Sequence, residues 1–247
     1  MIILKSQDEL ALMMKSGQIV KDALNLAEEK LRVGMTTAKL DRIIYDYITS
    51  QNAYPSFLGY MGFPGSACIS VNEEVVHGIP GARVIKEGDI VSVDVGAKLN
   101  GFHADAARTF PVGKIDAEKE KLIRVCKESF FKGMENFLEG GRLGDISSAI
   151  QQHVESNGFS VVRELVGHGI GRDIHEDPNV PNYGVKGHGL RLKAGMVLAV
   201  EPMICAGTHR IYQESNGWTI VTADMKPSAH YENTVALTED GIVYTTL

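Results

Sequence analysis

Residues 91–110 read VSVDVGAKLNGFHADAARTF and place Asp94 and Asp105 within two runs of apolar residues. The dipeptide Asn100-Gly101, flanked by alternating apolar positions, is a strong signal for a β-hairpin with a type I′ turn. If these two residues form the turn, Asp94 lies opposite Ala107. Side chains two residues apart on a strand share a face. We therefore expect Asp94 and Asp105 to be diagonal neighbours on one face, about 7–8 Å apart at the backbone.

The opposite face of this hairpin is expected to be core. It carries Val91, Val93, Val95, Phe102, Ala104 and Ala106. A carboxylate beside such a core is costly unless a positive group meets it. Two interpretations of the acidic face stay open from this stretch alone. It is either the solvent-exposed face of an antiparallel sheet, or a set of oxygen ligands that converge on a cation.

Composition and charge narrow the class of protein. The chain has 247 residues, of which 44% are hydrophobic and 23% charged, so it suits one large domain or two small ones. Its net charge of −6 gives no basic surface for nucleic acid. No apolar run is long enough to span a membrane, and the N-terminus lacks a secretory pattern. Three widely spaced cysteines favour a reducing compartment. We therefore expect a cytoplasmic protein, with a monomer as the simplest state.

Helix signals occur in the same order in both halves of the chain. The pattern Ser6-Gln7-Asp8-Glu9 is a capping box. We expect helices from this box to about Arg32, from Thr36 or Thr37 to about Gln51, from Asp116 to about Leu138, and from Asp145 to near Asn157-Gly158. In each half a long helix, a glycine stop and a shorter helix follow one another. This order indicates an internal duplication.

The strand patterns repeat as well. IKEGDIVSVDVG (85–96) aligns with LKAGMVLAVEPM (192–203) at a constant offset, so that Asp94 matches Glu201. We expect an α+β fold in a single domain, residues 1–247, with pseudo-repeats at about 1–110 and 111–247 and pseudo-two-fold symmetry. Asp94 and Glu201 are then expected to face each other across the pseudo-axis.

Other ionisable residues lie in apolar or glycine-rich settings. His77 lies in VVHGIP (75–80), His168 and His175 in ELVGHGIGRDIHEDP (164–178), Glu201 in VLAVEPMI (197–204) and Glu232 in SAHYENTVALT (228–238). Each alone fits a packed histidine or a carboxylate paired with arginine. Together, two Asp, two Glu and one or two His suit a pair of divalent ions. Oxygen-rich ligation with one imidazole favours Mn, Fe or Co over a structural zinc site.

Five motifs in order carry a resemblance to a known family. HGIP (77–80), DVGAKLNGFHAD (94–105), GHGIGRDIHEDPNVPNYG (167–184), VLAVEPMI (197–204) and SAHYENT (228–234) resemble type I methionine aminopeptidases over essentially the whole chain. The resemblance implies the pita-bread fold, a pseudo-two-fold antiparallel sheet with helices packed on its outer face. It also implies removal of the initiator methionine from peptides and nascent chains with a small second residue.

The resemblance also implies roles for single residues. Asp94, Asp105, His168, Glu201 and Glu232 would bind two divalent metal ions, Co, Mn or Fe, with Asp105 and Glu232 bridging both. A metal-bridged hydroxide would be the nucleophile, with Glu201 as general base. His175 and His77 would contact the substrate near the scissile bond, and the substrate's α-amine would bind near Asp94.

A methionine pocket is implied in the same way. Its lining would be Tyr60, Phe63, Cys68, His77, Ile174 and Trp218. Aromatic rings suit a thioether, because sulfur makes favourable contacts with ring edges. The alternative is that the loop SFLGYMGFPGSACIS (56–70) and Trp218 are ordinary packed residues.

The chain departs from the family pattern at three positions. His230 stands where Gln is usual, Asn233 where His is usual, and Ile174 where an aromatic residue is usual. None of these removes an implied ligand. His230 is two residues from Glu232 and so shares its strand face. It is expected either to tune metal preference or pH profile, or only to pack.

Three other functions stay open. An X-Pro dipeptidase or aminopeptidase would use the same ligands, but usually carries an N-terminal domain for which this chain has no room. A non-catalytic pita-bread binding module typically lacks the ligands that are present here. An acidic calcium-binding domain would show dense Asp/Asn loops, which the sequence lacks. We rank them in this order, behind methionine removal.

Overall fold

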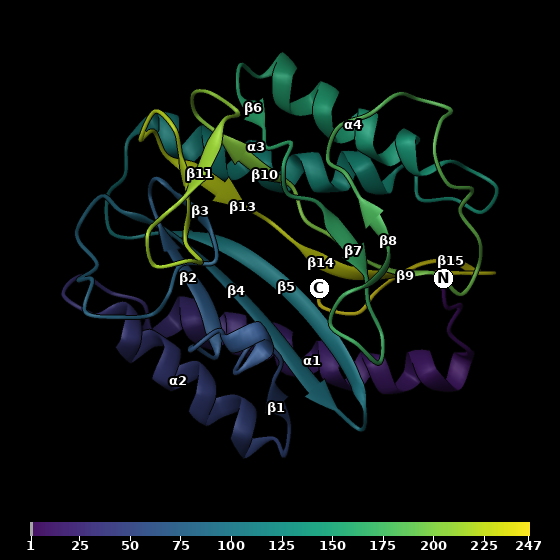
Figure 1. Cartoon of the computed structure of the whole chain (residues 1–247), viewed down its shortest axis with the longest axis horizontal. Coiled ribbons are helices and arrows are strands. Elements are labelled where there is room, and N and C mark those ends of the chain that lie inside the picture. The colour runs from purple at the N-terminus through teal and green to yellow at the C-terminus, as the bar shows by residue number, and fades with distance from the viewer. Residues whose placement is uncertain (1) are drawn as a thin grey trace.

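Helices lie on two sides of a central group of strands. The computed structural model describes residues 2–247, so Met1, where the predicted domain begins, lies outside it. The helices are α1 (Gln7–Lys30), α2 (Thr37–Ser50), α3 (Ala117–Met134) and α4 (Leu143–Ser156). Figure 1 shows α1 and α2 along one side of the strands and α3 and α4 along the other, which confirms the expected outer helices. None of the helices described is long and apolar enough to cross a membrane.

The helix boundaries confirm one signal and correct others. The capping box at Ser6 is present, since its hydroxyl accepts from the Glu9 N–H. The expected end of the third helix near Leu138 is wrong, because tighter turns replace the helix after Met134. The expected start of the fourth helix at Asp145 is two residues late, because this carboxylate caps the helix from inside, by accepting the backbone N–H of Arg142. The first helix likewise ends slightly early, at Lys30.

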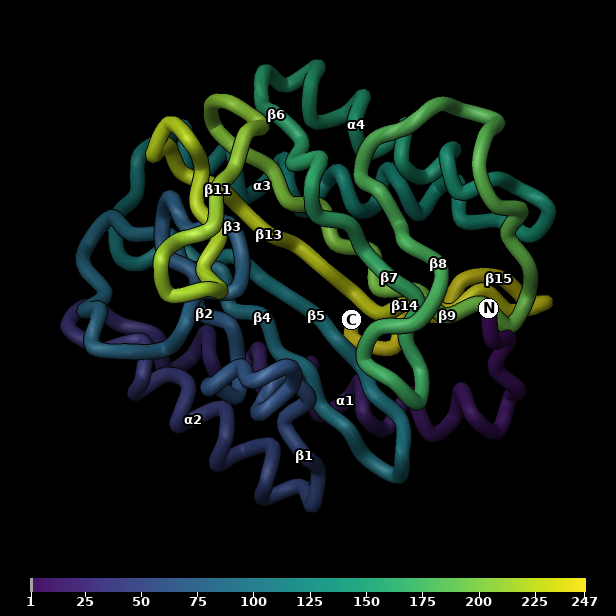
Figure 2. Tube along the Cα trace, viewed as in Figure 1, coloured from purple at the N-terminus to yellow at the C-terminus, as the bar shows by residue number. Residues whose placement is uncertain are grey.

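The strands form several small antiparallel sheets that Figure 2 allows the reader to follow along the chain. They are β1 (Tyr54–Pro55), β2 (Ala67–Val71), β3 (Glu74–Val76), β4 (Ile90–Leu99), β5 (Phe102–Pro111), β6 (Ser160–Val161), β7 (Gly167–Gly169), β8 (Glu176–Val180), β9 (Val197–Val200), β10 (Met203–Cys205), β11 (Ile211–Gln213), β12 (Ile220–Thr222), β13 (Ser228–His230), β14 (Asn233–Thr238) and β15 (Gly241–Tyr244). A short 3₁₀ helix spans Tyr60–Gly62.

The predicted hairpin is confirmed in both turn and register. Asn100 and Gly101 have φ of 52° and 84°, the positive values that a type I′ turn requires. Strands β4 and β5 pair with Asp94 opposite Ala107. Most of the predicted core face packs on α1 and α2 in one hydrophobic cluster, which includes Val91, Val93 and Ala106. Phe102 was expected on the same face, but it packs in another cluster with Met13 and Ile174. A second cluster joins α3 and α4 to β9, β13 and β14.

We call the paired strands β4 and β5 the first ladder. The second half of the chain builds an equivalent second ladder from shorter strands. β9 pairs with β14 and β10 with β13, and the register is the same on both sides of the break between them. This shared register places Glu201 opposite Glu232. The ladder is interrupted at Pro202, which has no N–H to donate. The second ladder therefore holds its two glutamates where its strands break.

The two ladders meet along β5. Ala107 and Glu232 exchange backbone hydrogen bonds, N to O, at 3.4 Å and 3.0 Å. Two residues away on one side, the Thr234 hydroxyl accepts from the Asp105 N–H and donates to the Asp105 carbonyl. On the other side, Thr109 makes the same two bonds with His230. We call these two pairs of hydrogen bonds, made by Thr234 and Thr109, the threonine clasps. Their symmetry places the pseudo-two-fold axis between Ala107 and Glu232.

Candidate metal centre

Four carboxylates from the two ladders converge at the floor of one cavity. Asp94 and Asp105 come from the hairpin, and Glu201 and Glu232 come from the second ladder. Asp105 and Glu232 are only 3% and 2% exposed, so the interpretation of an exposed polar face is wrong. Asp94, Asp105 and Glu232 each keep one buried carboxylate oxygen that has no hydrogen-bond partner among residues 2–247. Unsatisfied buried oxygens of this kind call for a cation.

His168 joins the carboxylates from β7. Its Nδ1 lies 2.9 Å from the Gly169 carbonyl, which leaves Nε2 directed at the acids. Nε2 lies 3.6 Å from Glu201 Oε1 and 3.9 Å from Asp105 Oδ2. The flanking glycines allow this placement, because a Cβ on Gly167 would lie 2.3 Å from the Ala199 carbonyl oxygen. A backbone acceptor on Nδ1 is the arrangement that prepares the other nitrogen for a metal.

Burial sets the charge state of the cluster. Desolvation raises the pKa of Asp94 to about 7 and raises the pKa values of Asp105, Glu201 and Glu232 well above the usual range. Desolvation lowers the pKa of His168 to about 3, so this imidazole is neutral at pH 7. In the part of the chain that the structure describes, no lysine or arginine forms an ion pair with these carboxylates. The donor set therefore fits divalent cations.

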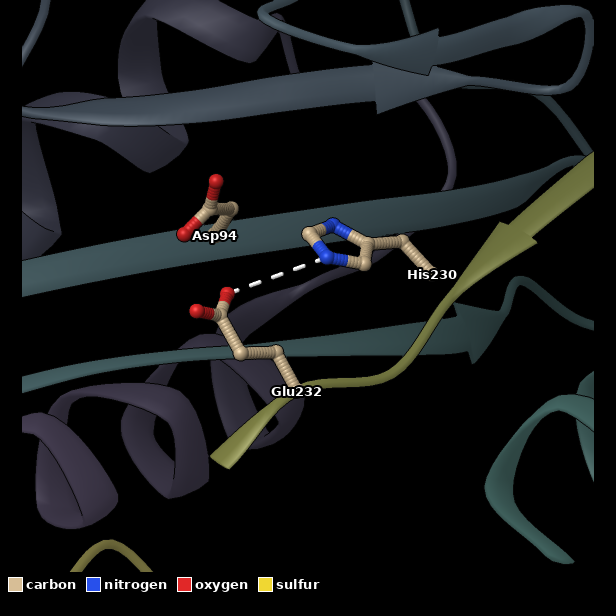
Figure 3. Close-up of side chains that lie close together, drawn as sticks. All are labelled: Asp94, His230 and Glu232. Atoms are coloured by element: carbon tan, nitrogen blue, oxygen red, sulfur yellow. Dashed lines mark ion pairs between the residues drawn. The ribbon is translucent and has the colours of Figure 1, made fainter. Parts of the chain in front are cut away.

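Two overlapping groups of side chains have the spacing of metal sites. One contains Asp105, His168 and Glu232, and the other contains Asp94, His230 and Glu232; within each group the ligand atoms lie within 4.8 Å of one another. Figure 3 shows His230 and Glu232 projecting from neighbouring positions toward Asp94, which comes from β4. The ligand set implied by the resemblance omitted His230. Its two-residue spacing from Glu232 was the signal that pointed to it.

The cavity above the carboxylates has a volume of about 270 Å³. The expected pocket residues Tyr60, Phe63, Cys68, His77, His175 and Trp218 all line it. Two further lining residues, Phe57 and Met61, were missed. The expectation that Ile174 lines the pocket is wrong, because its side chain is buried in the hydrophobic cluster that supports Phe63 and Trp218.

Two histidines lie on the cavity wall beside the carboxylates. His175 Nδ1 is 2.9 Å from the Tyr60 hydroxyl, and its ring centroid is 4.3 Å from that of His168. His77 has a φ of 58°, a left-handed backbone conformation that is uncommon away from glycine. Desolvation lowers the pKa of His77 to about 4, so it is neutral at pH 7. Both imidazoles can therefore exchange hydrogen bonds with a bound ligand.

Asn233, the second departure from the family pattern, takes part in hydrogen bonds that connect the two ladders. Its Oδ1 accepts from Arg108 Nη2 at 2.7 Å and from the Thr246 hydroxyl at 3.0 Å. The same guanidinium also donates to the carbonyl oxygens of Ala107 and Glu232. Asn233 and Arg108 thus tie the two ladders together beside the pseudo-axis.

The fold and the site together match a class of metallopeptidases. Residues 11–239 match metallopeptidase family M24, and the chain belongs to this family of hydrolases. The predicted α+β pita-bread fold is confirmed by solved members of the class.

Individual proteins that are similar to this chain indicate which members of the family it resembles. The methionine aminopeptidase of Clostridium perfringens is 60% identical over 241 residues, which cover 98% of this chain and 97% of the relative. The crystal structure of methionine aminopeptidase from Rickettsia prowazekii has a TM-score of 0.98 at 40% identity and full coverage of both chains, 100% each. Prolidase from Pyrococcus furiosus has a TM-score of 0.80 at 22% identity, covering 99% of this chain and 65% of the prolidase, which shows a shared fold alone. The predicted resemblance to methionine aminopeptidases is confirmed.

Proposed function

We propose that this chain is a dinuclear-metal aminopeptidase that releases methionine from the N-termini of peptides and nascent proteins whose second residue is small. The observation that carries the proposal is the convergence of four carboxylates, of which Asp105 and Glu232 are fully buried, and His168 beneath a cavity lined by aromatic rings. High identity to a methionine aminopeptidase over nearly the whole chain supports the same activity.

Five residues would hold the two divalent ions, Mn, Fe or Co. They are Asp94, Asp105, His168, Glu201 and Glu232, which all line the cavity. As the family resemblance implies, Asp105 and Glu232 would be shared between the two positions. Glu232 belongs to both groups of closely spaced ligand atoms, which supports its shared role. When bound, such ions supply a nucleophilic water near neutral pH and stabilise negative charge on the substrate carbonyl.

Glu201 would act as the general base. Its side chain is 13% exposed, the largest value among Asp105, Glu201 and Glu232, and it faces the cavity. Burial raises its pKa, so the carboxylate is basic enough to accept a proton from the attacking water. The same carboxyl would then return that proton to the leaving amine.

His175 and His77 would contact the substrate at the scissile bond. The hydrogen bond to Tyr60 holds the His175 ring over the cavity floor, where it can donate to the carbonyl oxygen as negative charge develops. His77 also lines the cavity, next to Trp218 at 6.4 Å between ring centroids, where it can contact the scissile nitrogen.

Methionine selection would depend on the aromatic end of the cavity. Phe63 and Trp218 pack edge to face with centroids 5.1 Å apart, and both line the cavity with Tyr60 and Cys68. Sulfur makes favourable contacts with ring edges. The free α-amine of the substrate would bind beside Asp94, which restricts cleavage to the first peptide bond.

The setting of the enzyme is proposed from composition. We place it in the cytoplasm as a monomer, in one catalytic domain of residues 1–247 with repeats at about 1–110 and 111–247, acting in protein maturation without nucleic-acid or membrane partners. Its net charge of −6 and its three buried free cysteines support this setting.

Peptide cleavage by metal-stripped protein tests the proposal. Mn²⁺, Co²⁺ or Fe²⁺ is added, and the substrates are peptides that begin Met-Ala, Leu-Ala and Ala-Pro, and an N-acetylated Met-Ala peptide. We expect metal-dependent release of methionine alone, with the acetylated peptide intact. Preference for Ala-Pro would instead indicate an X-Pro enzyme, and no cleavage with any metal would contradict a catalytic role.

A further inference from the structure

The pseudo-two-fold axis pairs each residue of one ladder with a residue of the other. Asp94 and Glu201 are equivalent, and the facing residues Ala107 and Glu232 are equivalent and exchange backbone hydrogen bonds. The residue two positions before each member of this central pair is then also equivalent. These two residues are Asp105 and His230. His230 therefore occupies the position at which the first ladder carries a proposed metal ligand.

The hydrogen bonds around this pair support the equivalence. Thr234 clasps the backbone of Asp105, and Thr109 clasps the backbone of His230, each with one donated and one accepted bond of 2.8–2.9 Å. Asp105 and His230 are therefore held at equivalent positions, each two residues before a member of the central pair. Their side chains leave the strands on the face that carries Glu232.

The His230 ring is buried, and its two nitrogens have no hydrogen-bond partner among the described residues. Its side chain is 2% exposed. Nε2 lies 3.7 Å from Glu201 Oε2. It also lies 3.7 Å from Glu232 Oε2, the contact marked in Figure 3. An imidazole left unsatisfied in this way is costly unless a ligand meets it.

The separations suit two atoms that share one ion. Ligand atoms about 2.1 Å from a metal lie about 3 Å apart at right angles and up to about 4.2 Å apart when opposed. The 3.7 Å separations of His230 Nε2 fall within this range. Glu201 directs Oε1 toward His168 and Oε2 toward His230, so its carboxylate lies between the two imidazoles.

We propose that His230 is a sixth protein ligand of the metal centre, and that its Nε2 binds the ion held by Asp94 and Glu232. This inference rests on the proposed function, because it adds a ligand to the same dinuclear centre. Each of the two ions then has one imidazole, His168 at one and His230 at the other. A position with an imidazole favours Fe, Co or Zn more than a position built only from carboxylates does.

Nitrogen NMR of the full chain tests the assignment directly. Histidine is labelled with ¹⁵N, and spectra are recorded without metal and with two equivalents of Zn²⁺. We expect two imidazoles to show the large shift of a metal-bound nitrogen. His168→Gln and His230→Gln should each remove one of the two shifted signals.

Calorimetric titration with Mn²⁺ provides the second readout. We expect His230→Gln to weaken one of two binding events by about 10- to 100-fold and to leave the other unchanged. Glutamine is a neutral polar side chain of similar length to histidine, so the variant is expected to fold. His103→Gln is the matched control. His103 is a buried histidine two residues before Asp105, but its Nδ1 is bonded to Ser56 at 2.8 Å, so its loss should leave both events unchanged.

The outcomes separate this inference from the proposed function. A shifted His168 signal with an unshifted His230 signal would overturn the sixth ligand and leave the dinuclear enzyme standing. No shifted imidazole and no Mn²⁺ binding would overturn both. An unchanged titration of the folded His230→Gln protein would also contradict the inference.

Discussion

The two ladders hold their acidic side chains in different ways. In the first, β4 and β5 are unbroken strands of 10 residues each, and Asp94 and Asp105 lie inside them. In the second, Glu201 and Glu232 lie where β9 gives way to β10 and β13 gives way to β14. Strand pairing holds the backbone both before and after each of the two aspartates. The break at Pro202 frees the backbone beside Glu201 from that constraint.

This difference suits different chemical tasks. Ligands that hold ions benefit from rigid strands, whereas a residue that moves a proton needs a side chain that reaches the substrate. Glu201 has both the break in its strand and a carboxylate that faces the cavity. The broken strand beside Glu201 supports the proposal that this residue transfers the proton.

Substitution of Glu201 is expected to have the largest effect. Glu201→Gln keeps the shape of the side chain but removes the base, so kcat should fall about 10²- to 10⁴-fold with little change in KM. Steady-state cleavage of a Met-Ala peptide measures this. Glu118→Gln, on the exposed surface of α3, is the control. A variant that keeps more than half of the wild-type kcat would contradict the assignment of the base.

Metal affinity is expected to rise with pH. Burial raises the pKa of Asp94 to about 7 and those of Asp105, Glu201 and Glu232 well above their usual range, so these carboxyls must release protons before an ion binds. His168, with a pKa lowered to about 3, releases none. From pH 8 to pH 6 we expect affinity to fall by about tenfold per pH unit for each proton released.

Titration calorimetry of Mn²⁺ in two buffers of different ionisation enthalpy measures both the affinity and the protons released. The same titration of Asp94→Asn should release fewer protons from the first ladder. An affinity that is flat between pH 6 and pH 8 would show that the carboxyls are already ionised in the metal-free protein.

Loss of either threonine clasp should destabilise the junction of the ladders by similar amounts. Thr109→Val and Thr234→Val each leave a buried backbone N–H and C=O without their partner, at a cost of about 1–3 kcal/mol. Thr109 also bonds Ser92 at 2.8 Å, so its variant should be the less stable of the two. Urea unfolding of the metal-free proteins measures the difference. Effects that differ by more than a factor of three would break the symmetry argument.

The smallest effect is expected at the turn that only the first ladder has. Gly101→Ala places a side chain at a φ of 84°, where no atom of residues 2–247 lies within 4 Å of the new Cβ, so the strain comes from the backbone alone. We expect a loss of about 1 kcal/mol in the free energy of unfolding. Gly81→Ala is the control, because its φ is not positive and its nearest atom is 3.9 Å away. Equal stability of the two variants would mean that the turn does not determine the register.

Much of the first ladder was predictable from neighbouring residues. The Asn100-Gly101 turn determines that Asp94 lies opposite Ala107, and the Ser6 capping box marks the start of α1. The alignment of the repeats anticipated that Glu201 is the counterpart of Asp94. Each of these inferences depends on a few adjacent residues or on direct comparison of two segments. The errors at the ends of α3 and α4 concern single turns, where several residues compete for the cap.

The centre itself was less predictable. Ile174 was expected in the cavity but packs behind it, because the β7–β8 connection turns this side chain into the hydrophobic cluster. The place of His230 depends on the pairing of Ala107 with Glu232, two residues far apart in the chain. Strand alternation indicates which face His230 shares with Glu232, but says nothing about which carboxylates stand opposite.

Local chemistry in the amino-acid sequence determined the hairpin, the helix order, the duplicated strand pattern and the residue types of a metal centre. Tertiary packing decided how the two ladders meet. It also left the His230 ring without a hydrogen bond and enclosed the four carboxylates. The physical reason is that a turn specifies register only between the strands it joins. The register between β5 and the strands of the second half depends on burying both apolar faces under their helices at the same time.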